Sequence, residues 1–175
     1  MAREAADAFA LDRVLIVPAG CPPHKSDSTG ASWADRFRMV ELACAVDPRF
    51  EPSRLEEGEQ KSYSILTIEK VKAQKPDKLY FILGADAFAD IATWYRWRDV
   101  VALTRFIVVT RPGHSYATPD GARVDRLDTV ALPVSSSEIR RRLALGEMPD
   151  ELPDAVGRYI IEHGLYDWPT ASPPA

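Results

Sequence analysis

The sequence predicts an α/β fold in which a mostly parallel sheet is doubly wound by helices. Two observations predict it. Short aliphatic runs that stop at Pro, Gly or Arg recur along the chain, and their residues are apolar on both faces, as in buried parallel strands. Between these runs lie segments with a helical spacing of apolar residues, and strand and helix in alternation indicate right-handed crossovers.

Length, composition and charge narrow the kind of protein further. The chain has 175 residues, 46% of them hydrophobic and 27% charged, which fits one domain over residues 1–168 with a disordered Pro- and Ala-rich tail over 169–175. A net charge of −4 argues against nucleic acid as a partner but allows small anionic ligands. No run of about 18 apolar residues occurs, so we expect no membrane segment.

The chain contains two cysteines, Cys21 and Cys44, which do not form a metal-binding pair. We expect reduced thiols in a cytoplasmic protein. The sequence leaves open whether the protein forms a homodimer.

The elements follow from these patterns in order. The start, MAREAADAFALD, indicates an amphipathic helix. The expected strands are RVLIVPA (13–19), KLYFILG (78–84), RFIVVTR (105–111) and DTVALP (128–133). The expected helices are ADRFRMVELACAV (34–46), SILTIEKVKAQK (64–75), RWRDVVAL (96–103), SSEIRRRLALG (136–146) and DAVGRYIIEHG (154–164). The stretch PGHSYATPDGARVD (112–125) is expected to be the longest loop.

The first strand is followed by GCPPHKSD. Pro22 and Pro23 stiffen this turn, and His24 and Lys25 then lie beyond the carboxyl end of a strand, where ligands bind in doubly wound sheets. A rigid surface loop with solvated charges explains the same residues.

The second strand is followed by ADAFADIATWYRW. Gly84 permits close backbone approach to a ligand, and Asp86 either caps the next helix or accepts hydrogen bonds from a ribose. Trp94 and Tyr95 belong either to the core or to a platform on which a ring stacks. Arg111, at the end of the third strand, is either a solvated edge or a ligand contact.

The fourth strand leads into PVSSSEIRRRLALGE. Ser135 and Glu138 have the spacing of a capping box. The same helix start, with serine hydroxyls and Arg140 above it, also suits a polyphosphate. Arg141 and Arg142 are expected in solvent, because successive helical positions are about 100° apart.

Together these segments resemble the bacterial nicotinate-nucleotide adenylyltransferase family of the nucleotidyltransferase superfamily. The matching stretches are VPAGCPPHK (17–25), ADRFRMVELA (34–43), SYSILTIEKV (62–71), FILGADAFADIATW (81–94), VVTRPG (108–113), VSSSEIRRRL (134–143) and VGRYIIEHGLY (156–166). The resemblance implies a Rossmann-like nucleotidyltransferase fold. It also implies transfer of AMP from ATP to nicotinate mononucleotide with Mg²⁺, giving deamido-NAD and pyrophosphate.

The resemblance also assigns roles, with no protein ligand to a metal. The implied catalytic residues are His24, Lys25 and Arg140. The implied ATP-binding residues are Gly84, Asp86, Arg111, Ser135, Ser136, Ile139 and Arg140. The implied mononucleotide-binding residues are Ser62, Tyr63, Thr67, Trp94 and Tyr95. The attacking phosphate oxygen is already anionic, so catalysis needs alignment and charge stabilisation rather than a base.

One departure from the family is large. Its members open with a strand and a G-x-F-x-P-x-H-x-G-H turn, to which nothing in this sequence corresponds. We therefore expect a fold that lacks its first strand, and weak or absent turnover by the chain as printed. The explanations are an upstream start codon, which we favour, a strand donated by another chain, or a rearranged sheet. The alternative functions are another adenylyl- or cytidylyltransferase and a catalytically impaired nucleotide-binding homologue.

Overall fold

The computed structural model describes residues 1–21, 30–59, 61–110, 115–129 and 135–169. Its strands are β1 (Val14–Ile16), β2 (Phe50–Pro52), β3 (Tyr80–Gly84), β4 (Arg105–Thr110) and β5 (Arg123–Asp128). The helices are α1 (Ala2–Ala8), α2 (Trp33–Cys44), α3 (Ser64–Lys72), α4 (Ala85–Ala89), α5 (Trp97–Leu103), α6 (Ser136–Ala144) and α7 (Asp154–Glu162). Two 3-10 turns, η1 (Ile91–Thr93) and η2 (Leu165–Asp167), complete the described elements.

All described strand pairs are parallel, as expected. β1 pairs with β2, with Val14 opposite Phe50. β4 lies between β3 and β5 in a second sheet, with Arg105 opposite both Tyr80 and Arg123. The parallel α/β class is therefore confirmed, whereas the expectation that the fold lacks its first strand stays a prediction.

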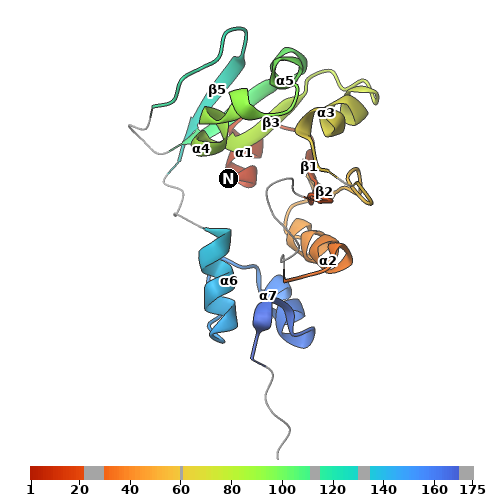
Figure 1. Cartoon of the computed structure of the whole chain (residues 1–175), viewed down its shortest axis with the longest axis vertical. Coiled ribbons are helices and arrows are strands. Elements are labelled where there is room, and N and C mark those ends of the chain that lie inside the picture. Colours follow the sequence, from red (N-terminus) through yellow and green to blue (C-terminus); the bar gives the residue numbers. More distant parts are fainter. Residues whose placement is uncertain (22–29, 60, 111–114, 130–134, 170–175) are drawn as a thin grey trace, which may run out of the picture.

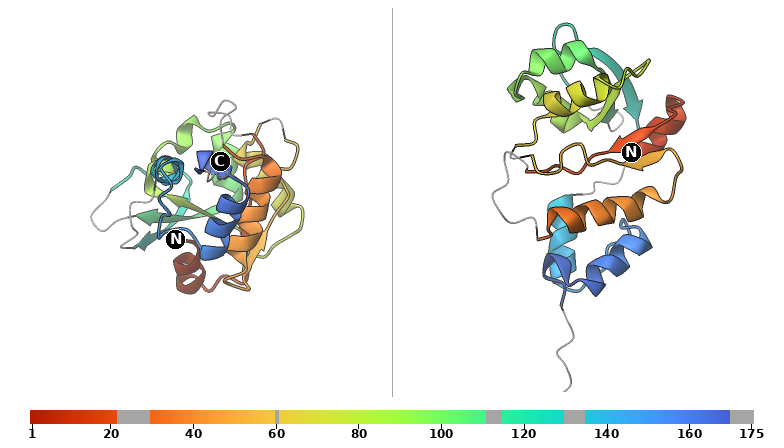
Figure 2. Two further views of the ribbon diagram at one scale, coloured as in Figure 1. Left: turned by 90° about the horizontal axis from the view of Figure 1, so that it is seen from below. Right: turned by 90° about the vertical axis from the view of Figure 1, so that its right-hand side faces the viewer.

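The β3–β4–β5 sheet has helices on both faces (Figures 1 and 2). On one face, Phe106 packs in a cluster with Phe88 of α4 and Val100 of α5. On the other, Ile107 packs with Ala5 of α1. All five side chains are at most 1% exposed. Adjacent residues of β4 thus enter opposite cores, as the period of a strand requires, and this explains why the sequence of β4 is apolar throughout.

A separate cluster joins α2, α6, α7 and η2, which lie together in the lower part of Figure 1. Its buried residues are Met39, Leu143, Val156, Ile160 and Leu165. Helix α2 begins with a capping box, in which the Asp35 N–H donates to Ser32 Oγ at 3.1 Å and the Ser32 N–H donates back to the Asp35 carboxylate at 3.3 Å. The start of α2 is therefore fixed by its own sequence.

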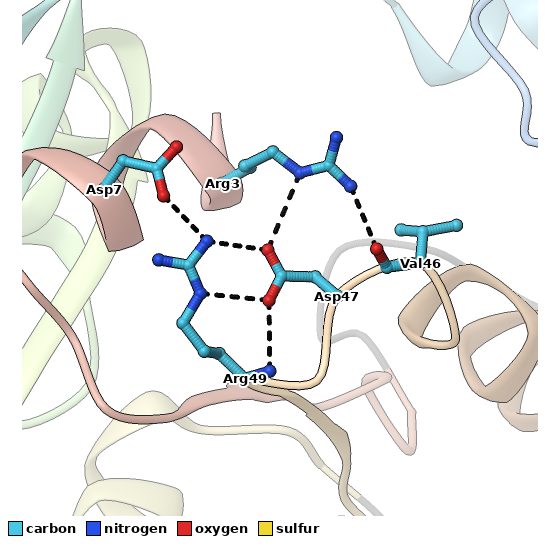
Figure 3. A network of polar contacts seen from close by, with 5 residues as sticks. All are labelled: Arg3, Asp7, Val46, Asp47 and Arg49. Carbon is cyan, nitrogen blue, oxygen red and sulfur yellow. Dashed lines mark hydrogen bonds and ion pairs between the residues drawn. The ribbon is translucent and has the colours of Figure 1, made fainter.

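An ion network ties α1 to the start of β2 (Figure 3). The Asp47 carboxylate, whose side chain is 7% exposed, accepts bonds from Arg49 Nε at 3.0 Å and Nη2 at 2.7 Å. Arg49 also reaches Asp7 of α1 at 2.7 Å, and Arg3 lies 3.6 Å from Asp47. The hydrogen bonds from Arg49 lower the pKa of Asp47 to about 2, because they stabilise its ionised form.

The prediction for the last strand was wrong. β5 begins at Arg123, inside the segment expected to be a loop, and of the expected strand 128–133 only Asp128 belongs to it. Thr129 lies outside the strand, and residues 130–133 lie outside the described residues. Because each position of β5 is exposed or only partly buried, its sequence is polar and lacks the apolar run typical of a central strand. The three-residue strand β2 was also missed.

Within the described ranges, no helix combines the length and apolar content that a membrane crossing needs.

Candidate active site

The turn after β1 is fixed from both sides. Arg36 of α2 donates to the Ala19 carbonyl at 2.5 Å and to the Gly20 carbonyl at 3.1 Å. From the opposite side, the Cys21 N–H donates to Ser62 Oγ at 3.2 Å, and the Ser62 N–H donates to the Cys21 carbonyl at 3.0 Å. A Cβ at Gly20 would lie 2.2 Å from the Glu56 carbonyl oxygen, so the turn requires glycine.

Arg36 also lines a cavity of about 330 Å³ between α2, α6, α7 and η2. Its polar lining consists of Arg36, Ser136, Arg140 and Tyr166. Its apolar lining consists of Met39, Ile139, Leu143, Leu152, Val156 and Ile160. The structure thus brings three of the predicted ATP-binding residues to one cavity, with a second arginine across from them on another helix.

The start of α6 differs from the prediction. Ser135 is the N-cap residue, but its side chain makes no capping hydrogen bond. Glu138 instead accepts two bonds from Arg141, at 2.9 and 2.6 Å, and these bonds lower its pKa. The predicted capping box was therefore wrong, because a guanidinium one turn away competes for the carboxylate. The first N–H groups of α6 are not capped by Ser135.

Arg140 differs from its neighbours in its partners. Its Nε donates to the Ser136 carbonyl of its own helix at 3.1 Å, and within the described part of the chain it forms no ion pair. Arg141 pairs with Glu138, and Arg142 with Glu147 and Glu151. Among the three consecutive arginines, only Arg140 combines a place at the cavity with a charge that no described carboxylate neutralises.

The aromatic residues divide into a core part and an exposed part. Trp94 is partly buried and packs edge-on against Phe81, with ring centroids 5.8 Å apart. Tyr95 is 53% exposed, and its ring centroid lies 4.6 Å from that of Tyr63, with the rings tilted by 39°. The structure thus brings together two of the predicted mononucleotide-binding residues, Tyr63 and Tyr95, from segments far apart in the sequence.

The predicted hydroxyl contacts are already engaged within the protein. Ser62 Oγ accepts from the turn after β1, as described above. Thr67 Oγ1 donates to the Glu56 carboxylate at 2.5 Å. The Ser62 hydroxyl therefore links the residues before α3 to the turn after β1, and the Thr67 hydroxyl links α3 to Glu56.

Gly84 and Asp86 lie where β3 passes into α4. Gly84 is the N-cap of α4, and Asp86, which is exposed, lies in the first turn of the helix. The expectation that Asp86 caps the helix was therefore wrong. Among the described residues, a Cβ at Gly84 would meet no atom within 4 Å.

His24, Lys25 and Arg111 lie outside the described residues. The cavity beside Arg140 is not lined by Trp94. What links the two groups of predicted residues is the turn at Ala19–Cys21, held by Arg36 on the cavity side and by Ser62, next to Tyr63, on the aromatic side. The convergence of all these residues on one crevice stays a prediction.

Arg36 and Tyr166 were not predicted as site residues from the sequence. Both lie in stretches quoted for the family resemblance, ADRFRMVELA and VGRYIIEHGLY. An arginine on a helix and a tyrosine after one are common on protein surfaces, so only the folded cavity distinguishes them.

The chain matches known proteins over most of its length. Residues 1–142 match the cytidylyltransferase-like family. A protein of Solibacter usitatus named "Probable nicotinate-nucleotide adenylyltransferase" is 58% identical over 168 residues, which cover 95% of this chain and 89% of that protein. This chain belongs to the nicotinate-nucleotide adenylyltransferase family. A member from Neisseria meningitidis with the same name is 40% identical, and the match covers 95% of this chain and 90% of the other.

Solved structures of the family share the fold. A Plasmodium falciparum nicotinic acid mononucleotide adenylyltransferase complexed with NaAD superposes with a TM-score of 0.76 at 19% identity, covering 96% of this chain and 89% of that one. A Vibrio parahaemolyticus nicotinate-nucleotide adenylyltransferase, described as putative, gives a TM-score of 0.65 at 16% identity, covering 94% and 85%. The predicted Rossmann-like nucleotidyltransferase fold is thereby confirmed.

Proposed function

We propose that this protein transfers AMP from ATP to nicotinate mononucleotide, giving deamido-NAD and pyrophosphate. The observation that carries the proposal is the cavity that places Arg140 and Ser136 beside Arg36. Two guanidinium groups around one cavity, and a helix start that the Ser135 side chain does not cap, suit a polyphosphate. The identity to the relatives named above narrows the second substrate to a pyridine mononucleotide.

The reaction needs positioning more than proton transfer. A phosphate oxygen of the mononucleotide attacks the α-phosphorus of ATP and forms a new P–O bond. The bond between the α-phosphorus and the oxygen that bridges it to the β-phosphate breaks, and pyrophosphate leaves. The attacking oxygen is already ionised, so the protein supplies alignment and positive charge. Arg140 contacts the ATP phosphates in this proposal, and Lys25, His24 and Arg111 approach the reacting phosphates.

The aromatic residues Trp94 and Tyr95 bind the pyridine ring. Trp94 and Tyr95 form the platform in this proposal, with the Tyr95 ring in contact with Tyr63 and the Trp94 ring packed on Phe81. Ser62 and Thr67 shape this pocket through the bonds they make to the turn after β1 and to Glu56. Gly84 leaves room for the nucleotide at the end of β3, and Asp86 reaches its ribose.

Mg²⁺ enters this proposal with the substrate. Among the described residues, no group of three or more His, Cys, Asp and Glu side chains is arranged to hold a metal ion. Mg²⁺ prefers phosphate oxygens and water and needs few protein ligands, so it is expected to arrive as MgATP. A cytoplasmic location and a homodimer stay predictions.

The test is a product assay with purified protein, ATP, MgCl₂ and nicotinate mononucleotide, in which chromatography measures deamido-NAD and pyrophosphate. Phosphopantetheine as acceptor and CTP as donor serve as competing substrates for the other transferase functions. Formation of deamido-NAD in preference to the other products supports the proposal. Binding of an ATP analogue and of the mononucleotide by calorimetry, without turnover, would favour the impaired homologue instead.

A further inference from the structure

Tyr166 has an unusual backbone conformation. It lies at φ 58° and ψ 37°, in the left-handed region, and Asp167 follows with φ 58°. Side chains other than glycine rarely adopt this region, and such residues persist where the surrounding structure holds them. The Tyr166 N–H donates to the Gly30 carbonyl at 3.2 Å, and a Cβ on Gly30 would lie 2.9 Å from the Tyr166 ring.

These contacts place the phenol at the cavity. Tyr166 lines it together with Arg36, Arg140 and Ser136. Within the described residues, no group forms a hydrogen bond with the Tyr166 hydroxyl. Burial raises the pKa of this phenol above its ordinary value, and the opposing effect of the charges of Arg140 and Arg36 is smaller. The hydroxyl is therefore protonated at neutral pH and can donate.

Packing alone does not explain this hydroxyl. The ring belongs to the apolar cluster of α2, α6 and α7, and phenylalanine would fill the same space. A partly buried phenol usually finds a hydrogen-bond partner. Tyr159, one turn before the end of α7, has one, because its hydroxyl donates to Asp35 Oδ1 at 3.0 Å.

Arg36 contributes charge from a fixed position. Its two terminal nitrogens bind the carbonyls of Ala19 and Gly20, whereas its Nε is buried without a partner in the described structure. The guanidinium cannot leave this position without breaking both bonds. It thus adds positive potential to the cavity wall, which Arg140 also lines.

We propose that Tyr166 is a phosphate-binding residue, whose hydroxyl donates a hydrogen bond to the polyphosphate that Arg140 and Arg36 attract. The identity of the ligand as the phosphates of ATP rests on the proposed function. The strained backbone at Tyr166 and Asp167 fixes the direction of the phenol, so the donor is in place before the anion binds.

The test uses tripolyphosphate alone as the probe. Calorimetry is expected to show that Tyr166→Phe weakens its binding about tenfold, the loss of one charge-assisted hydrogen bond. The matched control is Tyr159→Phe, which removes a hydroxyl from a tyrosine that does not line the cavity and is expected to leave this binding unchanged. In the turnover assay, Tyr166→Phe is expected to raise the KM for ATP and leave that for the mononucleotide unchanged.

A second measurement does not depend on a substitution. With labelled tyrosine rings, the NMR signal of Tyr166 is expected to shift when tripolyphosphate is added to the unmodified protein, and that of Tyr159 is not. An unchanged affinity in folded Tyr166→Phe, an unmoved Tyr166 signal, or no binding of tripolyphosphate would overturn the inference. If Tyr166→Phe weakens tripolyphosphate binding but the protein forms no deamido-NAD, the proposed function fails and this inference stands.

Discussion

Arginines at the amino ends of the parallel strands and arginines on the carboxyl side have different kinds of partner. At the amino ends, three arginines are neutralised within the protein: Arg13 pairs with Glu51, Arg49 with Asp47, and Arg105 with Asp125. A fourth, Arg123, donates to the carbonyls of Ala102 and Thr104. On the carboxyl side, Arg36 binds only backbone carbonyls among the described groups, and Arg140 binds only a carbonyl of its own helix. At Gly84, on the same side, an added Cβ would meet no atom of the described residues within 4 Å.

This difference separates stability from binding. A guanidinium that is satisfied by a carboxylate fixes two chain segments to each other but has little left to offer an anion. One that faces a cavity without a carboxylate partner contributes less to folding and is available for a ligand. Substitutions at the two ends should therefore have opposite effects on stability and on nucleotide binding.

The largest effect is expected at Arg140. Arg140→Ala should weaken ATP binding by about 1.5–3 kcal/mol, or about 10- to 150-fold, because charge-assisted bonds to phosphate are lost. Its unfolding free energy should change by less than about 0.5 kcal/mol. Calorimetry with an ATP analogue and thermal unfolding measure both. Arg141→Ala is the matched control on the same helix, and an unchanged ATP affinity in folded Arg140→Ala would contradict the phosphate role.

Asp47 provides the opposite case. Its pKa of about 2 in the folded protein is below the ordinary value of 3.8, so the ionised carboxylate stabilises the fold above about pH 4, and this contribution is lost as the pH falls towards 2. Asp47→Asn should unfold at a higher pH than the parent in an acid titration followed by circular dichroism. Its ATP affinity at neutral pH should be unchanged.

The exposed Asp150→Asn serves as the control for this titration. Equal acid unfolding of Asp47→Asn and the parent would show that the network of Figure 3 does not stabilise the fold.

Substitutions of Tyr95 and Trp94 test whether these residues bind the mononucleotide. Tyr95→Ala should raise the KM for nicotinate mononucleotide about 2- to 12-fold, as one aromatic stacking contact of about 0.5–1.5 kcal/mol is lost. Because its ring is 53% exposed, stability should change little. Trp94→Ala should raise the same KM and also lower the melting temperature, since its ring packs on the core. A rise confined to the KM for ATP would show that Trp94 and Tyr95 do not bind the mononucleotide.

The smallest effect on folding is expected at Gly84. Its φ of −75° suits any residue, and a Cβ meets no atom of the described residues within 4 Å, so Gly84→Ala should change stability by less than about 0.5 kcal/mol. If a nucleotide approaches the backbone there, the variant should raise the KM for ATP several-fold. Gly20→Ala is the contrast, because its Cβ has no room and the variant should be destabilised at neutral pH. Unaltered kinetics in Gly84→Ala would show that no ligand comes this close.

Much of the fold could be predicted because its signals are local. β3 and β4 are apolar on both faces, and α2 and α7 carry a helical spacing of apolar residues, so each pattern indicates its own element. β5 could not be predicted in the same way. It is partly exposed, and its polar sequence becomes a strand only because β4 supplies an edge to pair with.

The candidate site was predictable where a motif is continuous in the sequence and not where neighbours come from afar. Ser136, Ile139 and Arg140 share one short segment, and they share one cavity. Glu138 was expected to cap α6, yet Arg141 takes its carboxylate, because two acceptable partners lie within reach and only the folded geometry selects between them. Tyr63 and Tyr95 were both selected, but their contact could not be foreseen.

The sequence by itself determined the strand and helix order, the glycine at the end of β3, and the serine and arginine element that indicates a polyphosphate ligand, since each depends on residues close together along the chain. The tertiary structure alone decided which charges are neutralised and which face a cavity. The physical reason is that a charge or hydroxyl takes its role from its nearest partner in space. For Arg36, Asp47 and Tyr166, that partner lies on another element of the fold or is absent from the described structure.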